Sequence, residues 1–164
     1  MILRPARAAD AAAICAIWNP VIRDTLVTFT TEEKTEAGIR ADIAARGPLF
    51  LVAEAEGGLL GFATSFQFRA GPGYAFTHEH SIQLAPRARG RGVGRALMTR
   101  LEAEAAAQGV HALWAGVSAA NPGGAAFHAR LGYVRVARLP EVGFKAGRWL
   151  DLILMQKRLR PVHG

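Results

Sequence analysis

The sequence predicts an α/β fold built on one mixed sheet in which antiparallel pairs predominate. Runs rich in β-branched and aromatic residues alternate with segments of helical periodicity, and two strand-like runs follow each other directly through a glycine turn. The order strand, helix, helix, three strands, helix, strand, helix, two strands is typical of α/β proteins with a mixed sheet. With 164 residues, 51% of them hydrophobic, the chain is expected to be a single domain over residues 1–164.

The first third of the chain predicts one strand and two helices. Residues 2–5 favour a short strand, and a helix is expected from Asp10, as its N-cap, to about Trp18. Thr30 and Glu33 form a capping-box pattern, which predicts the start of a second helix ending near Gly47.

The middle of the chain predicts three consecutive strands. Residues 48–69 read as a hairpin around Gly57 and Gly58, and the "RAGPG" stretch at 69–73 then breaks the chain. A long strand is expected from Tyr74 to Leu84, where Pro86 prevents its extension.

The last part predicts two helices between strands. One helix of about 15 residues is expected to begin near Gly92, with Gly109 just past its end. A second spans residues 121–132, because Asn121 and Pro122 suit the N-cap and first position of a helix. The remaining strands are expected at residues 111–118, 133–139 and 148–159.

Charge and cysteine usage narrow the partners and the compartment. The formal net charge is +7, which favours an anionic partner: nucleic acid, an acidic protein or a polyphosphate cofactor. No apolar run is long enough to span a membrane. The single cysteine, Cys15, excludes an internal disulfide and suits the cytoplasm.

The stretch "LAPRARGRGVGRALM" concentrates arginines in a glycine-rich segment. Gly90, Gly92 and Gly94 let the backbone approach a ligand, and the first amides of the following helix lack internal partners. Such a turn suits a phosphate group. The spacing fits neither a Walker loop nor the dinucleotide fingerprint G-x-G-x-x-G. The alternative is a basic surface turn that only caps a helix.

Three blocks of the sequence resemble one family. Arg89-x-x-Gly92-x-Gly94, between a strand and a helix, is similar to the R/Q-x-x-G-x-G/A motif of the GNAT N-acetyltransferase superfamily. "THEHSIQLAPRARGRGVG", "AANPGGAAFHARLGY" and "EVGFKAGRWLDLILMQKRL" resemble its phosphinothricin and methionine sulfone (methionine sulfoximine) acetyltransferase branch. The resemblance implies a GNAT fold of about seven strands and four helices, acetyl-CoA as cosubstrate with CoA as product, and a homodimer.

The resemblance also assigns positions to the two ligands. The turn implied to hold the pyrophosphate of acetyl-CoA consists of Arg89, Gly90, Arg91, Gly92, Val93, Gly94 and Arg95. Further cofactor contacts are implied for the strand backbone at Ile82, Gln83 and Leu84 and for Asn121. Contacts with the acceptor are implied for Phe29, Arg69, Ala70, Gly71, Glu79, His80 and Ser81. The chain departs from the branch at His78, Gln83 and Gly124, which leaves the acceptor open.

Glu79 is the candidate general base. Strand alternation places it on one face with Ser81 and Gln83, while His78, His80, Ile82 and Leu84 share the other face. Acetyl transfer to an amine requires removal of a proton from that amine, and the resemblance puts the branch's catalytic glutamate at this position. The alternative is a glutamate that pairs with an arginine or faces solvent.

Two further parts of the chemistry have candidates. His128 stands where many relatives place a tyrosine that could protonate the departing thiolate, and the alternative is a structural hydrogen bond. A strand amide near Leu84 would stabilise the oxyanion if the strands separate there. His78 and His80 share a face, but no third ligand follows at a recognisable spacing, so no metal site is predicted.

The sequence therefore predicts an acetyl-CoA-dependent N-acetyltransferase for the α-amine of a small amino-acid-like molecule. Phosphinothricin, methionine sulfone and methionine sulfoximine are the acceptors that the resemblance implies, and Arg69 could pair with their acidic group. Two alternatives stay open: an acetyltransferase for a polyamine, a drug or a protein N-terminus, and a basic nucleic-acid-binding module. Because the arginines gather at one turn, without interleaved aromatics, no nucleic-acid partner is expected.

Overall fold

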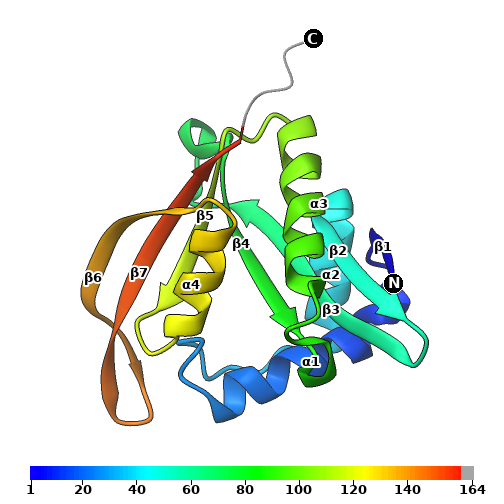
Figure 1. Ribbon diagram of the computed structural model, residues 1–164, viewed down its shortest axis with the longest axis horizontal. Helices are drawn as coiled ribbons and strands as arrows, with labels where there is room; N and C mark the ends of the chain where they lie inside the picture. Colours follow the sequence, from blue (N-terminus) through cyan, green and yellow to red (C-terminus); the bar gives the residue numbers. More distant parts are fainter. Residues whose placement is uncertain (160–164) are drawn as a thin grey trace.

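A computed structural model describes residues 1–159 as a seven-stranded sheet covered by helices on both faces (Figure 1). The strand order is β1-β2-β3-β4-β5-β7-β6, and every neighbouring pair is antiparallel except β4 with β5. The strands are β1 (Ile2–Pro5), β2 (Phe50–Ala55), β3 (Gly58–Gln67), β4 (Thr77–Leu84), β5 (Ala112–Ser118), β6 (Val134–Lys145) and β7 (Arg148–Arg158). The mixed, mainly antiparallel sheet predicted from the sequence is confirmed.

Four α-helices cover the sheet, two on each face. The apolar sides of α1 (Ala11–Asp24) and α2 (Glu36–Arg46) pack on one face, around Phe50, Val52 and Phe62. On the opposite face lie α3 (Val93–Ala107) and α4 (Pro122–Arg130), and α3 buries its apolar side in the larger core cluster (Figure 1). None of the helices in residues 1–159 combines the length and apolarity that crossing a bilayer needs.

The sheet opens between its two central strands. β4 and β5 pair in parallel only from Thr77 to Glu79, opposite residues 112–114. Beyond Glu79 the two strands diverge, as Figure 1 shows, and β5 continues its pairing with β7 on the other side. The opening leaves the second half of β4 without a partner on that side.

Both N-terminal helices differ from the prediction. The first continues six residues past Trp18, to Asp24. The predicted capping box is wrong: α2 begins at Glu36, and the Thr35 hydroxyl caps it by accepting a hydrogen bond from the Gly38 amide at 3.1 Å. Thr30 instead turns the preceding loop locally by accepting from the Glu32 amide.

Two strand boundaries were also predicted incorrectly. The strand expected from Tyr74 begins at Thr77, because Pro72–Tyr74 form a 3₁₀ turn after Gly71. The strand expected at 133–139 continues to Lys145 through two irregularities in its pairing with β7. The predicted hairpin at 48–69 and the helices after Gly92 and Asn121 are confirmed.

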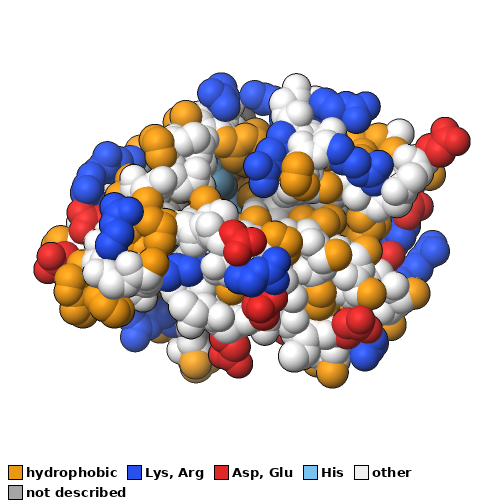
Figure 2. All heavy atoms as spheres, turned by 90° about the horizontal axis from the view of Figure 1, so that it is seen from below, with side chains coloured by type: hydrophobic (Ala, Val, Ile, Leu, Met, Phe, Trp, Pro, Cys, Tyr) orange, Lys and Arg blue, Asp and Glu red, His pale blue; other side chains and the backbone are white. Residues whose placement is uncertain are grey.

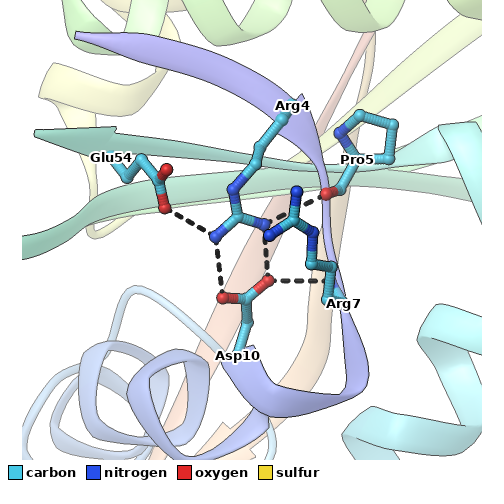
Figure 3. Close-up of polar contacts among 5 residues, drawn as sticks. All are labelled: Arg4, Pro5, Arg7, Asp10 and Glu54. Atoms are coloured by element: carbon cyan, nitrogen blue, oxygen red, sulfur yellow. Dashed lines mark hydrogen bonds and ion pairs between the residues drawn. The ribbon is translucent and has the colours of Figure 1, made fainter.

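A polar cluster fastens the edge strand β1 to the start of α1 (Figure 3). The Arg4 guanidinium donates to both carboxylate oxygens of Asp10, at 2.8 and 3.0 Å, and to Glu54 on β2 at 2.6 Å. Asp10 also accepts from the Arg7 amide at 2.7 Å. The Arg4 guanidinium holds the pKa of both carboxyls below their usual range.

Candidate active site

Two connected cavities occupy the opening between β4 and β5. The first, of about 260 Å³, reaches toward α1 and the loop over residues 25–35, and we name it the acceptor cavity. The second, of about 500 Å³, lies between the end of α1, Arg89 and α4, and we name it the channel. Seen from below, the molecule is hollowed on this face, with a histidine visible inside and basic side chains beside the hollow (Figure 2). Both cavities are lined by Val27, Ile82, Gln83, Asn121, Gly124 and His128.

The glycine turn contains backbone amides that lack a hydrogen-bond partner within residues 1–159. The first backbone hydrogen bond of α3 runs from the Ala96 amide to the Gly92 carbonyl at 3.0 Å, so the amides of residues 90–95 have no partner among the described residues. Gly90 and Gly92 have φ values of 71° and 78°, and a Cβ on either would meet nothing within 4 Å. This open, positively polarised turn can hold a phosphate.

The arginines of the turn lie around these amides. Arg89 lines the channel, while the exposed Arg91 reaches back to within 3.5 Å of the Arg87 carbonyl. Arg95 is exposed on the first turn of α3, whereas Val93 and Gly94 are buried in its base. Gly94 packs under Phe127 of α4, where a Cβ would lie 3.2 Å from the ring. The third glycine therefore serves helix packing, and the first two leave room above the turn.

The backbone of β4 offers free donors to the opening at alternate residues. Phe68 donates to the Thr77 carbonyl and Ala85 to the Leu60 carbonyl, so odd-numbered residues of β4 bond to β3. The amides and carbonyls of Ile82 and Leu84 consequently face the opening. The backbone of Gln83 is directed to β3, and its side chain lines both cavities.

Glu79 lies at the point where the strands part. Glu79 pairs with Trp114 of β5, and this is the last pair before the two strands diverge. A Cβ built on Gly116 would lie 3.0 Å from Glu79 Oε1. Gly116 lines the acceptor cavity, as does Ser81 on the same face of β4. Burial raises the pKa of the Glu79 carboxyl, and no arginine or lysine in residues 1–159 forms an ion pair with it. A partly desolvated carboxylate is a competent base.

His80 and His128 form a buried pair on the opposite face of the sheet. Their Nε2 atoms are 2.9 Å apart, and His128 Nδ1 lies 2.8 Å from the Gly124 carbonyl oxygen. Because a carbonyl only accepts, His128 carries its proton on Nδ1, and its Nε2 accepts from the Nε2–H of His80. Burial lowers the pKa of both rings, and for His80 the neighbouring His128 lowers it further. Both rings are therefore neutral, which favours a structural hydrogen bond over proton donation as the role of His128.

The wall of the acceptor cavity is a loop held from two sides. Lys145, buried at the end of β6, donates to the Thr28 carbonyl at 2.8 Å, and burial lowers its pKa. Phe29 packs on Gly143, where a Cβ would come within 2.5 Å of the ring. Asn19 of α1 bonds both backbone groups of Lys34, accepting from its amide at 2.7 Å and donating to its carbonyl at 3.0 Å.

The structure brings part of the predicted site to the two cavities. Phe29, His80, Ser81 and Asn121 line the acceptor cavity, and Leu84 and Arg89 line the channel. The 69–71 segment, the turn at residues 90–95 and Glu79 line neither cavity, although Glu79 is next to Gly116 of the acceptor cavity. The Gln67 side chain donates to the carbonyls of Arg69 and Gly71, and the Arg69 guanidinium lies 5.9 Å from the Tyr74 ring centroid.

Sequence reasoning missed several residues of the cavity wall. Trp18, Thr28 and Lys34 line the acceptor cavity, although no sequence pattern assigned these three residues to a site. Gly124 is explained by its neighbour: a Cβ there would collide with the Asn121 side chain, which caps α4 by accepting from the Gly124 amide at 3.0 Å.

A sheet opened beside a carboxylate, next to a helix whose first amides are free, defines an acyl-transfer site that takes a phosphate-bearing donor. Residues 17–133 match the Acetyltransferase (GNAT) family, and the chain belongs to this family. It is an N-acetyltransferase that uses acetyl-CoA. The free amides of residues 90–95 and the space above Gly90 and Gly92 fit the diphosphate of that cosubstrate.

The chain is similar to characterised acetyltransferases over nearly its full length. It is 37% identical to the L-amino acid N-acyltransferase MnaT of Escherichia coli, over 97% of this chain and 94% of the relative. It is 36% identical to the L-methionine sulfoximine/L-methionine sulfone acetyltransferase of Salmonella typhimurium, over 97% and 95%. The crystal structure of a phosphinothricin acetyltransferase from Sinorhizobium meliloti in complex with acetyl-CoA superposes with a TM-score of 0.90, at 32% identity, covering 99% of this chain and 94% of that one.

Proposed function

We propose that the chain acetylates the α-amine of a small amino-acid-like molecule of the phosphinothricin, methionine sulfone or methionine sulfoximine class. The observation that carries the proposal is a pair of connected cavities, one lined by Arg89 at the start of the glycine turn and the other lined by Gly116 next to Glu79. The names of the relatives support the acceptor class. We further propose that residues 1–164 form one domain, of which residues 160–164 lie outside the described part.

Glu79 is the proposed general base. Bound acetyl-CoA supplies the acetyl group as a thioester. The amine must be neutral to attack, so a proton passes from nitrogen to the Glu79 carboxylate, directly or through a water. Burial raises the pKa of the Glu79 carboxyl above that of a solvent-exposed glutamate, so its carboxylate is a stronger base near neutral pH.

The backbone of β4 is proposed to complete the machinery. The amides of Ile82 and Leu84 face the opening and can donate to the negative charge that develops on the acetyl oxygen. His128 could protonate the departing sulfur only after the buried pair with His80 had gained a proton, which burial disfavours. We therefore place Glu79, and not His128, at the centre of proton transfer.

A second copy of the chain is proposed to cover the β6–β7 edge. Val134, Val136, Val142, Phe144 and Trp149 are exposed there, and β6 ends the sheet with one side unpaired. Phe144 and Trp149 contact each other across the hairpin, with ring centroids 4.9 Å apart. An uncovered apolar sheet edge of this length favours association, and a homodimer would bury it. The cytoplasmic location inferred from the lone cysteine stays a prediction.

The test is an acceptor screen with release of free thiol as the readout. Methionine sulfone, methionine sulfoximine and phosphinothricin should support acetyl-CoA-dependent thiol release above the rate without acceptor. Spermidine and a peptide with a free N-terminus represent the alternative acceptors. Turnover with these and none with the amino acids would overturn the proposed substrate class. Thermal stabilisation by an oligonucleotide, without any by acetyl-CoA, would favour the nucleic-acid-binding alternative.

A further inference from the structure

The acceptor cavity carries one full charge. Among the described residues that line it, Lys34 is the one lysine, and no arginine, aspartate or glutamate is present. The two histidines at its border form the neutral buried pair described above. The Glu79 carboxylate lies next to Gly116 and is not part of the lining. An ammonium in a partly enclosed cavity whose lining contains no carboxylate favours an anionic group on the molecule that occupies the space.

Lys34 is aimed into this cavity by its surroundings. Its Nζ lies 4.7 Å from the ring centroid of Trp18, a cavity-lining residue that is only 8% exposed. The Asn19 side chain fixes the Lys34 backbone through both its amide and its carbonyl. The aromatic face attracts and orients the ammonium without neutralising it.

No carboxylate in residues 1–159 satisfies this ammonium. Two of the three glutamates within two positions of Lys34 are engaged elsewhere: Glu33 pairs with Arg23 at 3.0 Å and Glu36 with Arg40 at 3.2 Å. Lys34 also borders a neighbouring hollow lined by Glu32, Glu33 and Asp42, and none of these three carboxylates forms an ion pair with it. The charge is thus held in position and left available to a ligand.

We infer that Lys34 binds the anionic group of the acceptor and so selects amino acids over cationic amines. The inference rests on the proposed function and names the residue that recognises the acidic group of the acceptor. It assigns to Lys34 the role predicted above for Arg69, whose segment lines neither cavity. A polyamine would bring a second positive charge toward Lys34, which disfavours that class of acceptor.

The experiment compares an acid with its neutral carboxamide. kcat/KM is measured for L-methionine sulfone and L-methionine sulfone carboxamide, with wild type, Lys34→Gln and Lys34→Arg. Arg40→Gln is the matched control, because it removes an exposed positive charge from α2, outside both cavities. Lys34→Gln should lower kcat/KM for the acid about tenfold or more and leave the carboxamide within about twofold. Lys34→Arg should retain most of the preference, and the KM for acetyl-CoA should not change.

Phosphinothricin distinguishes the two possible sources of the negative charge. A greater loss with phosphinothricin than with methionine sulfone assigns Lys34 to the side-chain phosphinate, and an equal loss assigns it to the carboxylate. An acid-to-carboxamide ratio that is the same in wild type and Lys34→Gln overturns the inference, as does an equal loss in Arg40→Gln.

Binding separates this inference from the proposed function. If no acceptor is turned over, the acid and the carboxamide are titrated calorimetrically into the CoA-loaded protein. Binding of the acid that weakens about tenfold in Lys34→Gln would support the anion site although the proposed reaction had failed. Equal binding of the acid by wild type and variant would overturn it.

Discussion

Glu79 combines a position at the parting of two strands with an environment that suits a base. A Cβ on Gly116 would lie 3.0 Å from its Oε1, so the absence of a side chain at residue 116 keeps the carboxylate next to the acceptor cavity. A larger residue at 116 would separate the base from that space. The roles of residues 79 and 116 are therefore linked, although the sequence showed no sign of Gly116.

Glu79→Gln should lower kcat about 10²- to 10⁴-fold, because the amide cannot accept the amine proton. The KM for acetyl-CoA should stay within about twofold, since the turn at residues 90–95 is unaltered. Glu56→Gln, in the exposed turn between β2 and β3, is the control for loss of a carboxylate. A variant with wild-type kcat would remove Glu79 from the mechanism.

The pH profile tests the same residue. Burial raises the Glu79 pKa above its model-compound value of 4.5, and the base acts only when deprotonated. Activity of the wild type should therefore fall as pH decreases through the raised pKa, at a higher pH than for an exposed glutamate. Residual activity of Glu79→Gln should lack this acid limb. An identical limb in both proteins would assign it to another group.

At the scale of elements, the glycine turn before α3 does two separable things. The positive φ angles of Gly90 and Gly92 turn the chain between β4 and α3. Because these residues have no side chains, the space above the turn is open. Gly90→Ala should cost about 1–2 kcal/mol of stability from the left-handed backbone and raise the KM for acetyl-CoA several-fold. Gly147→Ala, in the β6–β7 turn, is the matched control, because its φ is also 71° and its surroundings are also open. An equal rise in KM for both variants would refute the role of the turn.

The contact between β1 and α1 gives a pH-dependent element of stability. Arg4 lowers the pKa of Asp10 and Glu54, so their stabilisation is present above the ordinary carboxyl range and is lost as pH falls. Asp10→Asn should cost about 1–2 kcal/mol at pH 7, measured by thermal or chemical denaturation. The difference from wild type should shrink below about pH 4. A constant difference between pH 7 and pH 3 would contradict this assignment.

Elements with local signals could be predicted from the sequence, and those set by long-range contacts could not. Asn121-Pro122 and the Gly57-Gly58 hairpin were predicted because cap and turn chemistry is local. Thr30 and Glu33 imitated a capping box, yet tertiary contacts through Asn19 hold this segment as a loop. The extension of β6 to Lys145 depends on pairing with β7 and on the contact with Thr28, neither of which a local pattern reveals.

The candidate site divides in the same way. The turn at 90–95, Glu79 and the strand backbone were found because a motif or an alternation marks them. Trp18 and Lys34 come from different elements, and only the fold brings them to one cavity wall, where Lys145 bonds to the lining residue Thr28. The resemblance implied acceptor contacts for residues 69–71, and in the structure the Arg69 guanidinium lies 5.9 Å from the ring centroid of Tyr74 in the 3₁₀ turn that follows.

For the whole molecule, the two edges of the sheet differ in character. The β1 edge is short and carries the Arg4 cluster, while the β6 edge is long and carries several large exposed apolar side chains. Trp149→Asp should convert a dimer to a monomer of 17.5 kDa, measured by light scattering during size-exclusion chromatography. Ile2→Asp is the control, because Ile2 is 60% exposed and Trp149 62%. A wild type that elutes as a monomer at all concentrations would refute the dimer.

Because β4 diverges from β5, peptide groups of β4 that bond to β3 alternate with peptide groups that face the gap. Ser81 and Gln83 donate to β3, whereas Ile82 and Leu84 have no strand opposite them. In deuterated water, the amide protons of Ile82 and Leu84 should therefore be replaced early and those of Ser81 and Gln83 late. A ligand seated along the gap would slow the fast pair, so the labelling pattern of four neighbouring residues would reveal its occupancy before any product was formed.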